Sequence, residues 1–210
     1  MPFENPVHVL NIILDKVLIQ AEREMTPTLN GRRILLRPLT IEDAPAIQSQ
    51  FPHWHIVKNL STKVPWPYPE DGAHQFLTHA VLPQMESGHF LGWAICEQAS
   101  PEQLIGVITY NPDGDKGLRR GFWLAEAHQG QGYMTEAVTL MQDYIFGTLE
   151  FPELFVMNAV ENTASRRIKE KLCGTYVGAV EFEHLSGGKE SEMWVIRRED
   201  WLKFRQEQSQ

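Results

Sequence analysis

A glycine-rich turn between a strand-like run and a helix is the feature that most constrains the fold of this chain. The apolar run that ends at Leu124 is followed by Ala125-Glu126-Ala127-His128, and Gln129-Gly130-Gln131-Gly132 then opens a helical pattern that continues to about Phe146. Glycines let the backbone approach a ligand closely, and the free N–H groups at a helix N-terminus attract anions. The turn therefore predicts a site for a phosphate or pyrophosphate group.

Two common nucleotide-binding folds do not fit this turn. A P-loop needs Gly-Lys-Ser/Thr to hold a γ-phosphate and Mg²⁺, and no such sequence follows the glycines. A Rossmann turn belongs to a parallel βαβ unit near the start of a domain. Here three strand-like runs precede the turn as an antiparallel meander, namely Phe90 to Cys96, Leu104 to Tyr110 and Leu118 to Leu124, with the polar stretch Glu97 to Gln103 as a hairpin connection. Taken alone, the turn is also compatible with an ordinary strand-to-helix connection.

The rest of the chain predicts an α/β (α+β) domain with a mainly antiparallel sheet flanked by helices. Residues 31–205 form this domain, and residues 1–30 form an N-terminal extension. The further predicted strands are Ile34 to Arg37, Leu154 to Val160, Tyr176 to Phe182 and Glu192 to Ile196, and the further helices are Asp43 to Gln50, Glu70 to Met85 and Ser165 to Leu172. In the extension, Val7 to Glu24 has the apolar spacing of an amphipathic helix, which either packs on the domain or acts as the arm of a homodimer.

Composition excludes some partners and favours others. A net charge of −8 argues against a general nucleic-acid binder, because phosphate neutralisation needs concentrated Lys and Arg. Two cysteines, Cys96 and Cys173, are too few for a disulfide framework and favour a reducing cytoplasm. No apolar run approaches the roughly 20 residues that span a bilayer, so we expect no membrane partner.

The motifs resemble those of the GNAT superfamily of N-acetyltransferases. Gly121-Phe122-Trp123-Leu124, then Gln129 to Met134, look like the coenzyme signature of that family, and Asn162-Thr163-Ala164-Ser165 resembles its Asn-x-x-Ser before the next helix. Upstream, Ile34 to Leu39 and Pro65-Trp66-Pro67-Tyr68 resemble the branch of ribosomal-protein N-terminal (alanine) acetyltransferases. Met134 stands where the family has Gly or Ala, and Arg119 stands where many relatives carry a Glu that acts as general base.

The resemblance implies a GNAT-like sheet of about seven strands and an acetyl-CoA-dependent transfer to a primary amine. The acceptor is then a peptide N-terminus or a small-molecule amine, which attacks the thioester directly in a ternary complex, and no metal is expected. The residues implied in coenzyme binding are Trp123, Leu124, Gln129, Gly130, Gln131, Gly132, Tyr133, Met134, Thr135, Asn162 and Ser165.

The catalytic and acceptor residues carry alternatives. Ser165 is the preferred proton donor to the leaving thiolate, but Ser165 and Asn162 also suit an N-cap. Glu126 and His128 have suitable acid–base chemistry beside the turn, although an exposed loop charge is the more usual explanation of each. Trp66 and Tyr68 suit one wall of the acceptor pocket, or packing under the proline-rich loop.

Two other functions remain open at this point. A fold that binds acyl-CoA as a sensor, or that has lost catalysis, would carry the same turn, with Met134 and Arg119 as its departures. A structural or interaction protein built around the Val7 to Glu24 helix is the third hypothesis.

Overall fold

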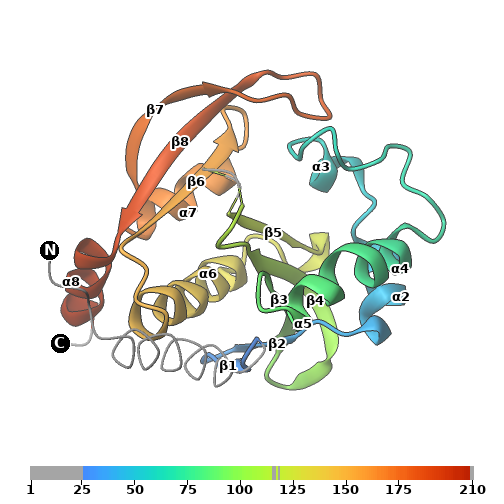
Figure 1. Ribbon diagram of the computed structural model, residues 1–210, viewed down its shortest axis with the longest axis horizontal. Helices are drawn as coiled ribbons and strands as arrows, with labels where there is room; N and C mark the ends of the chain where they lie inside the picture. The colour runs from blue at the N-terminus through green and yellow to red at the C-terminus, as the bar shows by residue number, and fades with distance from the viewer. Residues whose placement is uncertain (1–25, 115–116, 118, 209–210) are drawn as a thin grey trace, which may run out of the picture.

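The computed structural model describes residues 26–114, 117 and 119–208 (Figure 1). The amphipathic helix predicted for Val7 to Glu24, and the homodimer that it would support, lie outside these residues and stay predictions. Within the described ranges, no helix is long and apolar enough to cross a bilayer.

Among the described residues, five antiparallel strands form the first sheet, and they include the predicted meander. The order across the sheet is β1-β2-β3-β4-β5, with β1 at Leu29–Asn30, β2 at Ile34–Pro38, β3 at Leu91–Glu97, β4 at Ser100–Tyr110 and β5 at Arg120–Leu124. Trp93 and Ile95 lie in one buried cluster, the main core, whereas Ala94 and Cys96 lie in a second cluster. Because successive side chains of a strand point to opposite faces, both faces of this sheet are buried.

The connection between β3 and β4 is shorter than the sequence indicates. Glu97 pairs with Ser100, which leaves only Gln98 and Ala99 between the two strands. Residues 101–103 are exposed although they belong to β4. A polar composition is therefore compatible with both a turn and a solvated strand end, and the sequence pattern does not distinguish them.

Helices cover the two faces of the first sheet separately. α2 (Ala44–Gln50), α4 (Gly72–Phe76) and α5 (Leu82–Glu86) contribute side chains to the second cluster, and α6 (Tyr133–Asp143) contributes to the main core. The short helix α3 (Trp54–Val57) follows α2. The three helices predicted on this part of the chain are thus present in the predicted order, and α3 is an additional short helix that the sequence pattern did not indicate.

The predicted helix Glu70 to Met85 contains a π-helical turn at Leu77–Val81 between α4 and α5. There the amide of Leu82 donates to the carbonyl of Leu77, five residues back. Pro83 has no N–H for the carbonyl of His79, so an ordinary helical bond is missing at this point. The helix continues past the proline instead of ending at it.

The second sheet follows the order β6-β8-β7, with β6 at Glu153–Ala159, β7 at Thr175–Glu181 and β8 at Glu190–Arg197. β8 is antiparallel to both neighbours, so β6 and β7 run parallel with β8 between them. α7 (Thr163–Lys171) connects β6 to β7. β6, α7 and β7 thus form a βαβ-like crossover, with β8 inserted between the two parallel strands.

The two sheets meet at one end only. A single parallel bridge joins Gly117 to Val156 among the described residues, and the amide of Met157 donates to the carbonyl of Gly117 at 3.1 Å. From this vertex β5 and β6 diverge, and α6 and α7 begin at the open end (Figure 1). The mixed α/β fold with mainly antiparallel strands is confirmed, and the expected single sheet of about seven strands is divided into two sheets of five and three described strands.

A C-terminal helix that the sequence pattern does not predict, α8 (Arg198–Gln208), packs beside β8 and the end of the α6 segment. Its Trp201 is fully buried in the main core. The indole Nε1 donates to Asp143 Oδ1 at 3.0 Å. The helix therefore fastens the end of the chain to the same core that supports α6.

Candidate active site

The turn that dominates the sequence forms a loop between a 3₁₀ turn at Glu126–His128 and the first residue of α6. Gly130 has φ +74° and Gly132 has φ +84°, both in the left-handed region. Side chains with a Cβ disfavour this region, so glycine is required for the path of the loop. Gly132 is also the N-cap of α6, and no side chain caps the helix there.

The loop leaves a row of backbone amides without acceptors. Among the described residues, none of the six amides from Gly130 to Thr135 donates a hydrogen bond. The first amides of any helix lack partners within the helix, and the helix dipole adds positive potential at this end. These amides, which include those of Gln131, Tyr133 and Met134, have the donor groups and the positive potential that suit an anionic group.

Two glutamine side chains fix the shape of this loop. Gln129 Nε2 donates to the carbonyl of Leu124 at 2.8 Å, and Gln131 Nε2 donates to the carbonyl of Ala127 at 2.9 Å. Each bond spans the tight connection between β5 and α6. The two glutamine side chains therefore hold the backbone of the loop in place.

Arg33, at the start of β2, ties the loop to the first sheet. Its Nη1 donates to the carbonyl of Gln131 at 2.9 Å, and its Nε donates to Glu136 Oε2 at 2.9 Å. The backbone amide of Arg33 donates to Glu136 Oε1 at 2.8 Å. Because 103 residues separate Arg33 from Glu136, the sequence pattern could not indicate this contact.

The pH dependence of stability should report the contact between Arg33 and Glu136. Burial raises the pKa of Glu136, but hydrogen bonds from Arg33 and Ile34 outweigh it and hold the pKa below its ordinary value. The carboxylate therefore stabilises the fold fully above the unfolded-state pKa of about 4.3, and this contribution is lost as the pH falls through the folded-state pKa. We expect Glu136→Gln to cost about 1–2 kcal/mol at neutral pH.

Thermal unfolding at neutral pH and at acidic pH checks this expectation. The gap in Tm between wild type and Glu136→Gln should close on acidification, because the wild-type carboxylate is then protonated as well. Glu170→Gln removes an exposed charge from α7 and serves as the control. A gap that stays constant with pH would contradict a stabilising carboxylate.

Two coenzyme-site candidates direct their side chains away from the loop amides. The Tyr133 hydroxyl donates to Glu97 Oε1 on β3 at 2.6 Å. The side chain of Met134 is 9% exposed and belongs to the main core. The side chain of Met134 thus packs in the interior, although Met134 stands where the family has Gly or Ala. At the loop, Tyr133 and Met134 present only their backbone amides.

The edge of β5 that faces β6 carries free backbone groups. Asn111 donates to the carbonyl of Arg119, and Ala125 donates to the carbonyl of Ile105, so odd-numbered residues of β5 hydrogen-bond to β4. Bonding alternates along an antiparallel pair, so the N–H and C=O of Phe122 and the N–H of Leu124 point to the opposite edge. The side chain of Trp123 packs against the second cluster, on the face of the first sheet that α2 covers, and its ring centroid lies 5.4 Å from that of Phe51.

Asn162 and Ser165 lie together at the start of α7. Asn162 Oδ1 accepts from the amide of Ser165 at 3.1 Å, so the capping alternative for Asn162 is present in the structure. Ser165 is 7% exposed, and its hydroxyl is not used for capping. Lys169 Nζ lies 2.7 Å from Ser165 Oγ, a contact that the sequence analysis did not indicate.

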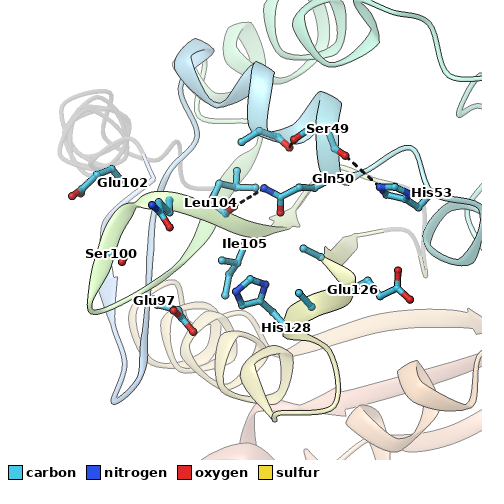
Figure 2. Close-up of a pocket in the computed structure, with 14 residues that line it drawn as sticks. Ser49, Gln50, His53, Glu97, Ser100, Glu102, Leu104, Ile105, Glu126 and His128 are labelled. Carbon is cyan, nitrogen blue, oxygen red and sulfur yellow. Dashed lines mark hydrogen bonds between the residues drawn. The ribbon is translucent and has the colours of Figure 1, made fainter.

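Glu126 and His128 lie beside a cavity of about 540 Å³ between α2, the β3–β4 hairpin and the segment Ala125 to His128 that follows β5 (Figure 2). Figure 2 shows His128 directed toward Ile105, while the carboxylate of Glu126 points away from it. Glu126 is 78% exposed and lies 3.8 Å from His55 Nε2 on α3. No residue of α7 lines this cavity, so it is distinct from the Ser165 region.

Trp66 and Tyr68 take different positions. The Tyr68 ring packs 5.3 Å from that of Phe51, and burial raises its pKa, so packing accounts for this residue. Trp66 is 41% exposed, and its ring centroid lies 5.4 Å from that of Trp54. Trp66 and Trp54, which is 46% exposed, therefore present an aromatic surface at the start of α3.

The connection between β7 and β8 lies beside the segment that follows α3 (Figure 1). The amides of Leu185 and Ser186 donate to the carbonyls of Leu60 and Lys58 at 3.0 and 2.9 Å. His184 is 3% exposed, with Nδ1 3.0 Å from the carbonyl of Asn59. These hydrogen bonds join the β7–β8 connection to the segment after α3, although the two are far apart in the sequence.

Comparison with known proteins agrees with this arrangement. A family model described as an acetyltransferase (GNAT) domain matches residues 33–175. A curated relative, the probable N-acetyltransferase YjcK of Bacillus subtilis (strain 168), is 29% identical over 155 residues, which cover 68% of this chain and 81% of that protein.

Solved structures share the fold at low sequence identity. The ribosomal-protein-S5-alanine acetyltransferase of Vibrio fischeri is similar with a TM-score of 0.69 and 15% identity, over 83% of this chain and 98% of that chain. RimJ of Mycobacterium smegmatis, solved in complex with CoA-disulfide, has a TM-score of 0.70 and 18% identity, over 83% and 88%. The family model covers well over half of the chain, and the chain therefore belongs to the GNAT acetyltransferase family.

Proposed function

We propose that this protein is an N-acetyltransferase that moves the acetyl group of acetyl-CoA to a primary amine. The observation that carries the proposal is the row of unpaired amides from Gly130 to Thr135 beside the free edge of β5. A pyrophosphate is an anionic acceptor and fits amides at a helix N-terminus. The amides of the pantetheine arm then pair with the free groups of Phe122 on β5, as an added strand would.

The start of α7 completes this coenzyme site. Asn162 uses its Oδ1 for the helix cap, and its Nδ2 has no acceptor among the described residues, so it can donate to a pantetheine carbonyl. Ser165 lies one turn further and offers a hydroxyl to the leaving sulfur. The N-termini of α6 and α7 then flank the coenzyme from both sides of the open end.

The reaction that we propose is direct attack of a neutral amine on the thioester carbonyl. The N–H groups at the free edge of β5 stabilise the oxyanion of the tetrahedral intermediate, and the coenzyme leaves as a thiolate. The amine must lose its proton first, and Glu126, His128 or a water molecule are the candidates for this step. Glu126 is the more accessible of the two side chains.

A peptide N-terminus or a small amine is the acceptor that fits this site. Two exposed rings, those of Trp54 and Trp66, and the carboxylate of Glu126 lie on or beside α3. Aromatic rings and a carboxylate both attract cations, so they suit a positively charged acceptor. The Vibrio fischeri protein of similar fold is a ribosomal-protein alanine acetyltransferase, which supports a protein N-terminus. The two free cysteines support a reducing cytoplasm as the compartment.

Thiol release from acetyl-CoA tests the proposal. Purified protein is incubated with acetyl-CoA and with a panel of N-terminal peptides, polyamines, amino acids and aminoglycosides, and the free thiol and the acetylated product are both measured. We expect acceptor-dependent thiol release with at least one amine class. Calorimetric titration with CoA, measured in parallel, should show binding.

The alternative is an acyl-CoA sensor or an inactive binding module. Arg119, where relatives carry a Glu, favours this alternative, because a guanidinium stays protonated and cannot accept a proton from the amine. Tight CoA binding without turnover on any acceptor would support the sensor. Absence of both binding and turnover would contradict the two functions together.

A further inference from the structure

Lys169 is a buried lysine in the second turn of α7. Its exposed fraction is 1%, and its Nζ lies 2.7 Å from Ser165 Oγ and 3.3 Å from the carbonyl of Ser165. A carbonyl only accepts hydrogen bonds, so the amine donates to it. The same amine therefore controls the position of the Ser165 hydroxyl.

The groups around Lys169 are polar, buried and incompletely paired. Arg120, at the start of β5, is 9% exposed, and its Nη1 donates to Gln142 Oε1 on α6 at 3.1 Å. Among the described residues, Arg120 Nη2 and Gln142 Nε2 are buried without a hydrogen-bond partner. Arg120 is the first residue of β5, close to the bridge between Gly117 and Val156 where the two sheets meet. These groups therefore lie near the closed end of the space between the sheets, on the side of α6 and α7.

The charges around Lys169 disfavour a permanent ammonium. Burial lowers the pKa of Lys169 well below its ordinary value, the charge of Arg120 on β5 lowers it further, and Glu192 on β8 raises it in part. Glu192 is itself paired with Arg166, whose Nε lies 2.8 Å from its Oε2, and accepts from Asn158 Nδ2 at 3.1 Å. The carboxylate of Glu192 is therefore shared between two donor side chains.

A lysine in such surroundings is costly to the fold. An apolar side chain of similar volume would avoid the desolvation of the amine and its repulsion with Arg120, and such replacements of buried charges are often neutral or stabilising. Perturbed ionisable groups beside a reactive hydroxyl are typical of functional sites. The geometry thus indicates a role for the amine beyond packing.

We propose that Lys169 is a positioning residue that acts through Ser165 to protonate the leaving thiolate, a role that rests on the acetyl transfer proposed above. As the C–S bond of the tetrahedral intermediate breaks, its electron pair stays on sulfur, and the Ser165 hydroxyl gives its proton to that sulfur. Ser165 Oγ takes a proton from the Lys169 ammonium in return. The lysine is left as a neutral amine, and solvent protonates it again before the next turnover.

The surroundings suit this direction of proton flow. A proton donor works best when its pKa lies near the working pH, and an ordinary lysine is too weak an acid for that. Loss of the proton also removes the repulsion between Lys169 and Arg120. The step therefore ends with less buried positive charge than it begins with.

Four variants test the role of Lys169. Lys169→Met keeps the length of the side chain without the amine, Ser165→Ala removes the hydroxyl, and the double variant combines them. Lys171→Met removes an exposed lysine from the same helix and serves as the matched control. For each protein, kcat, KM for acetyl-CoA, the Tm and the dependence of kcat on pH are measured with an acceptor that the wild type uses.

We expect Lys169→Met to lower kcat by about 10- to 100-fold with KM for acetyl-CoA nearly unchanged, as removal of a positioned proton donor would. Its Tm should equal or exceed that of the wild type. The wild-type kcat should fall as the pH rises through the pKa of Lys169, and Lys169→Met should lack this limb. The double variant should be no slower than Ser165→Ala, and Lys171→Met should match the wild type.

Several results would overturn the inference. A Lys169→Met protein with wild-type kcat would exclude the role while leaving the acetyl transfer intact. A lower kcat with a lower Tm and an unchanged pH profile would show that the lysine is merely structural. Fully additive losses in the double variant would show that Lys169 does not act through Ser165. A wild-type protein without turnover on any acceptor would overturn the proposed function, and this role with it.

Discussion

Replacing Gly132 by valine should lower the affinity for CoA by on the order of 100-fold, because the variant loses one or two hydrogen bonds to a charged group. Gly132 has φ +84°, and a Cβ placed on it would lie 3.3 Å from Arg33 Nη2. A β-branched residue cannot keep this conformation, so the amides around it must move. Calorimetric titration with CoA measures the effect.

The same substitution should also reduce stability, by about 1–2 kcal/mol, because the left-handed conformation is strained for any residue with a Cβ. Gly88→Val is the matched control: Gly88 has φ +73°, open space around a Cβ, and a position after α5, away from the loop. It should show the loss of stability without the loss of affinity. Unchanged CoA affinity in a folded Gly132→Val protein would exclude the loop as the phosphate site.

Replacing Trp201 by alanine should destabilise the protein by about 3–5 kcal/mol, the usual cost of removing a buried tryptophan. Trp201 is fully buried, its ring centroid lies 5.5 Å from that of Phe204, and its indole donates to Asp143. The variant loses this packing and leaves the Asp143 carboxylate with one donor fewer. For a chain of this size the fall in Tm should be about 10 °C.

Denaturant unfolding of Trp201→Ala and of Lys203→Ala separates packing from helix propensity. Lys203 is exposed on α8, so its substitution should change the free energy of unfolding by less than about 0.5 kcal/mol. A loss below about 1 kcal/mol for Trp201→Ala would show that α8 is not docked as described. At a temperature where the variant is folded, its CoA affinity should equal that of the wild type, because α8 does not contribute to the loop.

The Gly132 loop and the α8 helix differ in how far the sequence predicts them. The loop, the meander before it and the helix after it are local patterns, and the structure confirms them. The α8 helix was missed because most of Arg198 to Gln208 is polar or charged, and its few apolar residues do not form a clear stripe. The β3–β4 connection was placed too long because a solvated strand end has the composition of a turn.

The candidate site also contains parts that the sequence predicts and parts that it does not. The proposed coenzyme residues could be suggested from the sequence because backbone amides at a glycine turn can bind phosphate whatever side chains surround them. The side-chain roles could not be assigned in this way. Tyr133 and Met134 face β3 and the main core, and Tyr68 packs on Phe51, because tertiary neighbours decide where a side chain points.

The sequence by itself determined the glycine loop, the order of the strands and of the helices other than α3 and α8, and the family motifs, since each depends on residues that are close along the chain. Tertiary structure alone decided that Arg33 braces the loop through Glu136, and that Lys169 is buried beside Arg120. The spacing of Ser165 and Lys169 predicts that the two side chains can meet on one face of a helix. Whether the lysine there is an exposed charge or a buried amine depends on β5 and α6, which only the folded chain brings against it.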